Sequence, residues 1–348
     1  MPLPKKCRIS KGTTLSELAN FFDLSQEQLR QYHNIYCPLE DLIEDEIAPN
    51  TTIIFIPPDD KILRERIFNS KGGNFIKYIN PCTLEMPTYL DKKYGFIQTS
   101  YRNNRLEHRI HYEIKIRKNG NILTLNRTNF YINNCKTDLI IEQFLEEIGN
   151  VIYPLQIKSI ENESFLKISN FDEIKNRWNI LKKQLTVYYK GDIIHKIIGQ
   201  VDKSFRNEKV LRMHLLDSSF YFLFFQPIYS QFEDDFTKSF NTEVPLLFNN
   251  QKIPYNFKYK IDNTISDTKK FLINLKGSCL DKRTPKQIEN GKFVIQNLEQ
   301  QTSLVSSDFD VEYKLNTKDN SIFSIFGKIR MQLDTFEKKI IFECYEQS

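Results

Sequence analysis

Two histidines, His108 and His111, are the residue types in this chain that most suggest metal binding. They lie in a segment where apolar residues alternate with polar ones, as in a β-strand whose successive side chains point to opposite faces. Because they are three residues apart, they would point to opposite faces and would not bind one ion together. The sequence therefore predicts no metal site here. We expect no cofactor.

Acidic and nucleophilic residues also fall short of a recognisable active site. The pairs Asp234-Asp235 and Asp308 with Asp310 have the carboxylates that a glycosidase needs, but the sequence does not give the separation between two catalytic acids, and a solvated strand end explains Asp308 and Asp310 better. Cys135 and a distant histidine do not make a recognisable nucleophile site. The chain also lacks the HExxH, GxSxG, GxxxxGK[ST] and GxGxxG motifs. We therefore predict a protein that is not an enzyme.

Composition narrows the class of partner and the compartment. The 49 basic and 44 acidic residues are interspersed and give a net charge of +5, so we expect no nucleic-acid binding. No apolar run is long enough to predict a membrane span. Six scattered cysteines without a CxxC pair, and no apolar run after Lys5 and Lys6, favour a cytoplasmic protein or export without a classical signal peptide.

The chain divides into a module at residues 1–58, a linker at 59–94 and a large domain at 95–348. In the module, strand Cys7–Ile9 leads through Gly12 into two short helices. Each helix begins with a capping box, Thr14 with Glu17 and Ser25 with Gln28. A second strand, Ile53–Ile56, ends at two prolines. The predicted order is strand, helix, helix, strand.

That order resembles the LysM domain over residues 7–58. The resemblance is carried by Gly12-Thr13-Thr14-Leu15, by Leu29 to Asn34 and by Ala48-Pro49-Asn50. It implies a shallow groove, lined by the loops beside the two strands, that binds N-acetylglucosamine polymers such as peptidoglycan or chitin. The positions that would form the groove are Gly12, Thr13, Thr14, His33, Asn34, Ile35, Pro49 and Asn50.

The sequence departs from the family pattern at two groove positions and in one loop. Thr13 stands where the family usually has aspartate, and Asn50 where it usually has glycine. The loop between Asn34 and Pro49 is rich in aspartate and glutamate, which would repel anionic polymers. Two alternatives to glycan binding therefore stay open. One is a protein-binding adaptor or baseplate-type component of a contractile injection or secretion machine, and the other is an accessory of a cell-wall hydrolase.

The remainder of the chain predicts an α+β fold with a curved antiparallel β-sheet. Across 108–116 the alternation predicts a strand with one face in solvent, and Asn119-Gly120 predicts a hairpin turn. Helices are expected at 138–148, ending at Gly149, and within an insertion at about 171–226. The last of these spans 208–225 and includes the aromatic run 220–225, which is either core or a partner surface. Further strands are expected at 255–261, 269–276, 309–315, 322–333 and 338–345.

Overall fold

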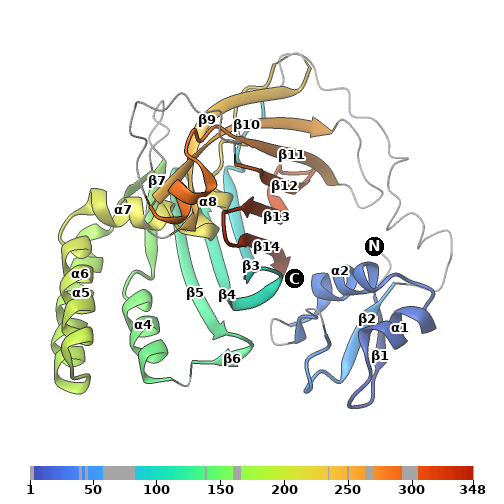
Figure 1. Ribbon diagram of the computed structural model, residues 1–348, viewed down its shortest axis with the longest axis horizontal. Helices are drawn as coiled ribbons and strands as arrows, with labels where there is room; N and C mark the ends of the chain where they lie inside the picture. The colour runs from blue at the N-terminus through green and yellow to red at the C-terminus, as the bar shows by residue number, and fades with distance from the viewer. Residues whose placement is uncertain are drawn as a thin grey trace.

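Two antiparallel sheets organise the protein, a two-stranded sheet near the N-terminus and a 12-stranded sheet that holds all the other strands of the described residues (Figure 1). The computed structural model describes residues 4–38, 41–43, 46–57, 83–137, 139–159, 166–233, 235–248, 251–262, 270–291 and 305–347. The α+β class and the large antiparallel sheet predicted from the sequence are confirmed.

The N-terminal module consists of β1 (Lys5–Arg8), α1 (Leu15–Phe21), α2 (Gln26–Tyr36) and β2 (Ile53–Ile56). Strand β1 pairs antiparallel with β2, and both predicted capping boxes are present. Each box satisfies backbone N–H groups that the first turn of a helix otherwise leaves without partners. The module has a core of its own, made of Leu15, Leu18, Ala19, Leu29, Ile43, Ile54 and Ile56.

The large sheet runs in the order β8-β7-β5-β4-β3-β14-β13-β12-β11-β10-β9, with β6 paired to β5. The last strand of the chain, β14, pairs with β3 and so joins an early and a late set of hairpins. The strands are β3 (Tyr89–Arg102), β4 (Arg105–Asn119), β5 (Ile122–Ile132), β6 (Cys135–Lys136), β7 (Leu155–Ser159), β8 (Leu166–Ile168), β9 (Thr237–Phe248), β10 (Gln251–Asp262), β11 (Lys270–Cys279), β12 (Ser307–Asn316), β13 (Ile322–Gln332) and β14 (Glu337–Gln347).

The helices of this part are α4 (Ile140–Asn150), α5 (Phe171–Tyr188), α6 (Asp192–Phe205), α7 (Glu208–Leu216), α8 (Ser219–Phe224) and α9 (Pro285–Glu289). Two predictions about them are wrong. Helix α4 continues through Gly149 to Asn150, and Gly149 does not adopt the positive φ with which glycine often ends a helix. The single helix expected over 208–225 is two helices, because Ser218 adopts an extended conformation.

The aromatic run in and beside α8 is core. Phe220 packs edge-on against Phe96, with ring centroids 5.5 Å apart, and Phe224 packs against Tyr94 at 5.6 Å. Both α8 rings are buried. Helix α8 therefore covers one face of the large sheet over β3.

The predicted linker, 59–94, is shorter than expected at its far end. Strand β3 already begins at Tyr89, and Leu84 is buried with its backbone N–H bonded to the Ser230 carbonyl oxygen at 3.0 Å. A short helix expected near residues 62–67 lies outside the described residues. The chain thus enters the large domain before residue 95.

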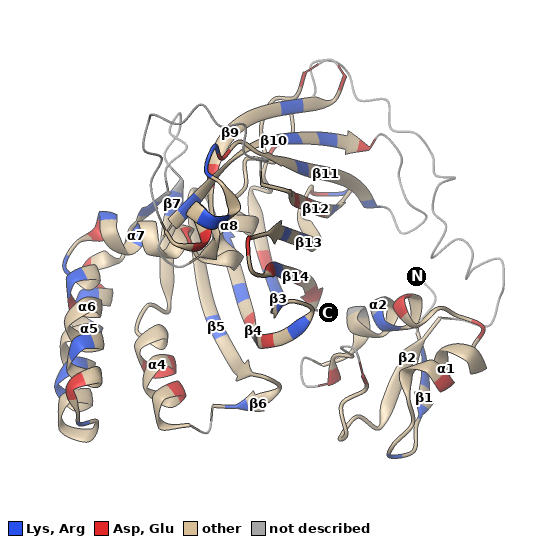
Figure 2. Ribbon diagram, in the orientation of Figure 1, with Lys and Arg blue, Asp and Glu red and all other residues tan. Residues whose placement is uncertain are grey.

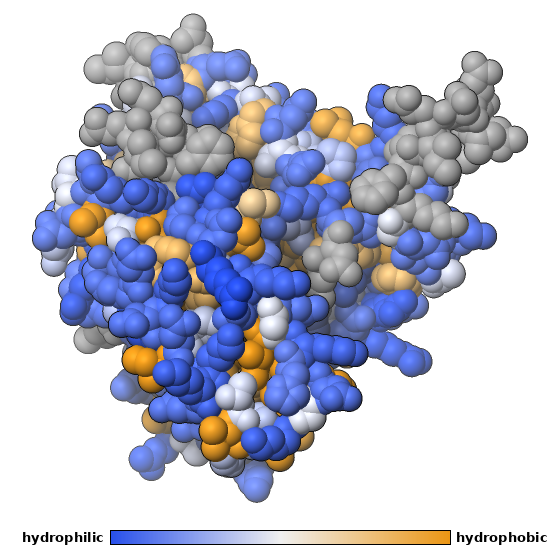
Figure 3. All heavy atoms as spheres, turned by 90° about the vertical axis from the view of Figure 1, so that its left-hand side faces the viewer, coloured by the Kyte–Doolittle hydropathy of each residue, from blue (hydrophilic) through white to orange (hydrophobic). Residues whose placement is uncertain are grey.

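Charged side chains of both signs are spread over both sheets and the helices, as Figure 2 shows. Exposed apolar side chains are less evenly distributed, and many lie on α4, α5 and the start of α6. In Figure 3 hydrophobic atoms form a broken strip in the lower half of the view, where these helices lie. No helix among the described residues is long and apolar enough to cross a membrane.

Candidate ligand-binding loops and their anchoring

The two loops predicted to bind ligand leave the same end of the β1–β2 pair. Arg8 lies opposite Ile53, and the Ile9 N–H donates to the Thr52 carbonyl oxygen at 3.1 Å, so the loop before α1 starts beside the loop before β2. Gly12 is exposed at φ +88°, a conformation that favours glycine. Both loops are therefore available at one edge of the module.

Two threonines shape the first loop. Thr13 is half-buried, and both its backbone N–H and its hydroxyl donate to the Ser10 carbonyl oxygen, at 3.2 and 2.7 Å. Thr14 is exposed and accepts from the Glu17 N–H at 3.2 Å, while its own N–H donates to the Glu17 carboxylate at 2.8 Å. These bonds hold the pKa of Glu17 below its ordinary value. The Thr14 hydroxyl accepts in the cap and can still donate its proton to a ligand.

The second loop closes as a tight turn, with the Thr51 N–H donating to the Ala48 carbonyl oxygen at 3.0 Å. Pro49 and Asn50 form its exposed tip. Thr51 itself is buried, and its hydroxyl donates to the Asp41 carboxylate at 3.1 Å. Pro49 and Asn50 are thus exposed, and the hydrogen bond between Thr51 and Asp41 holds the base of the turn.

His33 and Asn34, which the sequence placed in the groove, lie in the interior of the module instead. The His33 Nδ1 accepts from the Phe55 N–H at 2.9 Å, so its Nε2 carries the proton and donates to the Asp41 carbonyl oxygen at 2.8 Å. Burial lowers the pKa of His33, which favours this neutral ring. Asn34 bonds both the N–H and the carbonyl of Ile43, at 2.8 and 2.9 Å.

His33 and Asn34 therefore tie α2 to the following loop and to β2, and neither is exposed to a ligand. The side chain of Ile35 lies outside the described part of the structure. Of the eight predicted groove residues, the structure brings Gly12, Thr13, Thr14, Pro49 and Asn50 to one edge of the module.

The module also packs on the large sheet, which the sequence did not predict. Directly opposite residues on four neighbouring strands form a row across β14, β3, β4 and β5, and their side chains share one face: Glu343, Ile97, His111 and Tyr131. Cys37, Leu42 and Phe55 of the module contact the apolar members of this row. Arg109 and Glu113 of β4 are buried here too. The face predicted to be in solvent is thus an internal interface.

An ion pair, hereafter the Arg30–Glu343 clamp, joins α2 to β14. The Arg30 Nη1 lies 3.2 Å from the Glu343 Oε1, and Arg30 also pairs with Glu27 at 2.8 Å. The side chains of Arg30 and Glu343 are 17% and 5% exposed. Burial raises the pKa of Glu343, while Arg30 and Arg109 act to lower it. Because both side chains are largely desolvated, removing either one alone should destabilise the folded protein strongly.

His111 lies in the same interface and is held neutral. Burial, and then the charge of Arg109, lower the pKa of His111 to about 4. Its ring packs on Tyr131 with centroids 4.7 Å apart, and its Nε2 has no hydrogen-bond partner among the described residues. The imidazole is thus a packing residue whose protonation would place a second positive charge beside Arg109.

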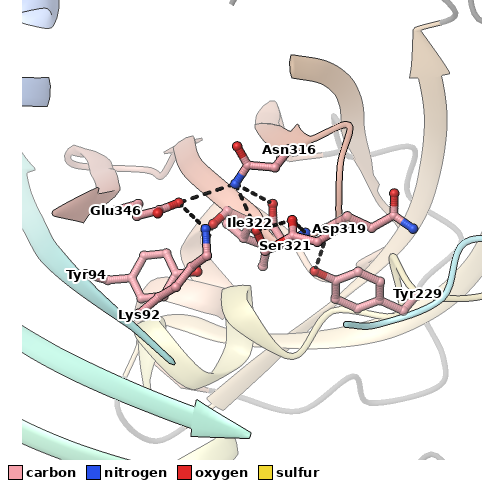
Figure 4. A network of polar contacts seen from close by, with 9 residues as sticks. Lys92, Tyr94, Tyr229, Asn316, Asp319, Ser321, Ile322 and Glu346 are labelled. Carbon is pink, nitrogen blue, oxygen red and sulfur yellow. Dashed lines mark hydrogen bonds and ion pairs between the residues drawn. The ribbon is translucent and has the colours of Figure 1, made fainter. Parts of the chain in front are cut away.

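A second polar cluster lies at one end of the large sheet (Figure 4). Lys92 pairs with Glu346 at 2.7 Å, and the Asn316 amide donates to the hydroxyl of Ser321 at 2.8 Å and to Glu346 at 3.3 Å. Asp319 accepts from the N–H and the hydroxyl of Ser321. Two tyrosine hydroxyls donate to backbone carbonyls of the same turn, Tyr94 to Ile322 and Tyr229 to Asn320. The polar groups of this cluster are thus hydrogen-bonded or ion-paired to one another or to the backbone, and the contacts hold the turn between β12 and β13 in place.

The described residues contain no group of three or more His, Cys, Asp or Glu side chains placed to share a metal ion. Asp308 and Asp310 are exposed on β12, and Cys135 is exposed on β6. Asp234 lies outside the described residues. Asp308 and Asp310, which the sequence offered as catalytic candidates, therefore face solvent.

No family model matches the sequence, and no curated protein matches it. Among solved structures, the chain is similar to one described as "lipid-protein interactions in lipovitellin", with 11% identity and a TM-score of 0.39. That alignment covers 76% of this chain and 25% of the lipovitellin chain, so the protein spans about a quarter of that neighbour. A likeness at this level carries no functional argument.

Proposed function

We propose that this protein is a non-enzymatic binding protein whose LysM-like N-terminal module engages a polymer containing N-acetylglucosamine. The observation that carries the proposal is the pairing of two exposed loops, Gly12 to Thr14 and Pro49-Asn50, at one edge of the module. Both stay exposed while α2 is docked on the large sheet. Hydrogen bonds of His33 to Asp41, of Asn34 to Ile43 and of Thr51 to Asp41 hold the base of the second loop before a ligand arrives, which lowers the entropy cost of binding.

The chemistry of these loops suits a neutral sugar. Acetamido groups need one donor and one acceptor each, and the Thr14 hydroxyl and the exposed backbone of Gly12 and Asn50 supply such groups. Pro49 adds an apolar contact. Asp41 and the exposed Glu46 place negative charge on the same loop, so uncharged chitin-type oligomers should bind better than anionic wall polymers. A single small contact of this kind supports a Kd roughly between micromolar and millimolar.

Titration of the full chain with chitin oligosaccharides, followed by calorimetry or by amide chemical shifts, tests the proposal. The informative variant is Thr14→Ala combined with Asn50→Ala. The matched control is Ser25→Ala, because Ser25 caps α2 with the same geometry and lies outside both loops. Each cap substitution should cost about 1 kcal/mol of stability. Only the loop variant should weaken oligosaccharide binding.

The glycan proposal fails if the unaltered chain shows no binding at millimolar oligosaccharide, or if Ser25→Ala weakens binding as much as the loop variant does. Equal losses would trace the effect to module stability and not to a groove. Comparing chitin oligomers with anionic peptidoglycan fragments then measures the contribution of the acidic loop.

A protein-binding adaptor, of the kind found in contractile injection or secretion machines, is the second candidate function. It is favoured by the exposed apolar side chains on α4, α5 and the start of α6, since a surface of this kind marks a protein interaction site. Co-purification from the native host, in the absence of any glycan binding, would support this candidate. Retention on purified chitin or peptidoglycan would favour the first.

A further inference from the structure

A concavity of about 580 Å³ lies at the turn between β3 and β4, lined by Arg102, Asn103, Arg105, Leu106 and Glu107. Sites that bind small molecules commonly have volumes of about 300–1,000 Å³. Arg102 is the last residue of β3, Arg105 is the first of β4, and the two pair directly across the strands. Directly opposite side chains share one face of a sheet, so two positive charges meet at this concavity.

The N–H groups of the two guanidiniums are not used within the protein. Among the described residues, neither Arg102 nor Arg105 forms a side-chain hydrogen bond or an ion pair. Arg102 stacks on Phe336, with its guanidinium carbon 3.7 Å from the ring centroid. Stacking uses the flat face of a guanidinium and leaves the N–H donors, which lie in its plane, available to a ligand. Like charges directly opposite each other destabilise a strand pair, so a bound anion would relieve the repulsion here.

The carboxylates near this turn bind other groups. Three of them contact partners outside the arginine pair: Glu107 with Lys338 at 2.7 Å, Glu337 with Arg330 at 2.5 Å, and Glu289 with the Thr335 N–H at 3.0 Å. Hydrogen bonds from Thr335, and then the charge of Arg102, hold the pKa of Glu289 below its ordinary value. Arg102 therefore acts on Glu289 only at longer range, and both arginines can still bind an anion from solution.

The turn that carries the two arginines is held in place by β14. Asn103 and Asn104 have φ of +50° and +60°, as the commonest two-residue hairpin turn requires. The Asn103 N–H donates to the Glu337 carbonyl oxygen at 3.0 Å, and the Asn103 side chain accepts from the Glu337 N–H at 2.8 Å. The Asn104 side chain accepts from Lys339 at 3.2 Å. The backbone of the site is thus ordered before a ligand binds, which reduces the cost of binding.

We propose that this concavity binds a small organic molecule through a phosphate monoester group. A guanidinium presents a planar fork of N–H donors that matches the oxygens of phosphate, and two guanidiniums match the charge of about −1.5 to −2 that a monoester carries at pH 7. The volume leaves room for an organic group beside the phosphate, and Leu106, which is 51% exposed, offers that group an apolar contact. Glu107 disfavours a second anionic group on the same ligand.

This phosphate site is independent of the proposed glycan site. Its residues belong to the β3–β4 hairpin of the large domain, whereas the glycan-binding loops belong to the N-terminal module. The ligands differ in charge as well, because the proposed glycan is neutral. A failure to bind chitin oligosaccharides would leave the phosphate site standing, and a failure to bind phosphate monoesters would leave the glycan proposal unchanged.

The test is titration of the full chain with phenyl phosphate at constant ionic strength, followed by calorimetry. We expect a Kd roughly between micromolar and millimolar, as a small contact allows. Phenyl sulfate has a similar shape and one negative charge, and inorganic phosphate lacks the organic group, so each should bind at least about 10-fold more weakly. The affinity for phenyl phosphate should fall as the pH is lowered through about 6, where the monoester takes up a proton.

Substitution of Arg105 gives the cleanest variant, because Arg105 has no side-chain contact that the fold needs. Arg105→Gln should weaken phenyl phosphate binding about 10-fold or more, and Arg105→Lys, which keeps the charge and loses the fork, should weaken it less. Arg117→Gln is the matched control, since Arg117 is a 60% exposed arginine of the same strand outside the concavity.

Three results would overturn the phosphate site: no binding of phenyl phosphate at millimolar concentration, equal binding of phenyl sulfate, or the same loss in Arg117→Gln as in Arg105→Gln. The last two would indicate attraction by the general charge of the surface. Inorganic phosphate that binds as tightly as phenyl phosphate would overturn the assignment of an organic ligand and leave free phosphate as the occupant.

Discussion

Replacing Arg30 of the Arg30–Glu343 clamp should destabilise the protein far more than replacing an arginine in a surface ion pair. Arg30→Met keeps much of the aliphatic stem and removes the charge, which leaves Glu343 in a site where its side chain is 5% exposed. Removing one partner of a buried pair costs roughly 3–5 kcal/mol. Arg109 still lies close enough to act on Glu343, so we expect the lower end, about 3 kcal/mol.

The assay is urea denaturation of four chains: unaltered, Arg30→Met, Glu343→Gln and the double variant. Glu343→Gln removes the buried charge, so Arg30→Met should cost less in its presence, and the cycle should yield a coupling of about 2 kcal/mol. The surface pair Arg117 and Asp91, in which Arg117 is 60% exposed, is the control. Arg117→Met should cost under about 1 kcal/mol.

Additive effects of Arg30→Met and Glu343→Gln, within about 0.5 kcal/mol, would refute the clamp as a coupled interaction. The number of unfolding transitions in urea provides a second test. If docking through the clamp is what joins the module to the large sheet, Arg30→Met should separate one cooperative transition into two. A single transition of unchanged slope would argue that the apolar contacts alone hold the module in place.

Two further predictions concern the sheet. The folded pKa of His111, about 4, lies below its unfolded value of about 6.5, so the folded state resists protonation, and stability present above pH 6.5 should be lost as the pH falls toward 4. The loss amounts to about 3 kcal/mol and should be largely absent in His111→Gln when both chains are unfolded by urea across this range. Gly277→Ala would place a Cβ 2.8 Å from the Phe257 ring and 2.9 Å from the Phe309 Cβ. This overpacking should lower the free energy of unfolding by roughly 1–3 kcal/mol. The control is Gly199→Ala, which should not destabilise α6 because its Cβ would have no atom within 4 Å.

Local signals in the sequence predicted most of the elements. The capping boxes at Thr14 and Ser25 and the strict alternation over 255–261 are complete within a few neighbouring residues, and the structure confirms them. Strand β9 is not among the elements predicted from the sequence, and it contains Pro245, which lacks the N–H that other strand residues donate. Among the strands that the structure describes, β9 lies at the end of the sheet order and pairs on one side, with β10.

The candidate site could be predicted only in part. Gly12, Thr14 and Asn50 belong to turns and caps that local sequence defines, so their exposure follows from the loops themselves. His33 and Asn34 gave the same polar signal, but their partners, Phe55 and Ile43, are fixed by the closure of the module. Local sequence does not distinguish a polar residue that binds a ligand from one that braces a loop.

The face of β4 that contacts the module could not be predicted for the same reason, because its partner is still farther away in sequence. Arg109, His111 and Glu113 alternate with apolar residues, which is typical of a strand with one face in water. They are buried because α2, whose Arg30 is 313 residues from Glu343 in sequence, packs over this part of the sheet. A charged strand face can be either solvent surface or an interface rich in ion pairs, and only the tertiary partner decides which.

Docking also affects how the proposed loop site would work. A module on a free linker would sample many orientations relative to the large domain. Contacts of Cys37, Leu42 and Phe55 with the sheet, together with the clamp, fix the module on the large domain. The proposed loop site would therefore keep one orientation relative to the large sheet, and a polymer bound there would be held in one orientation too.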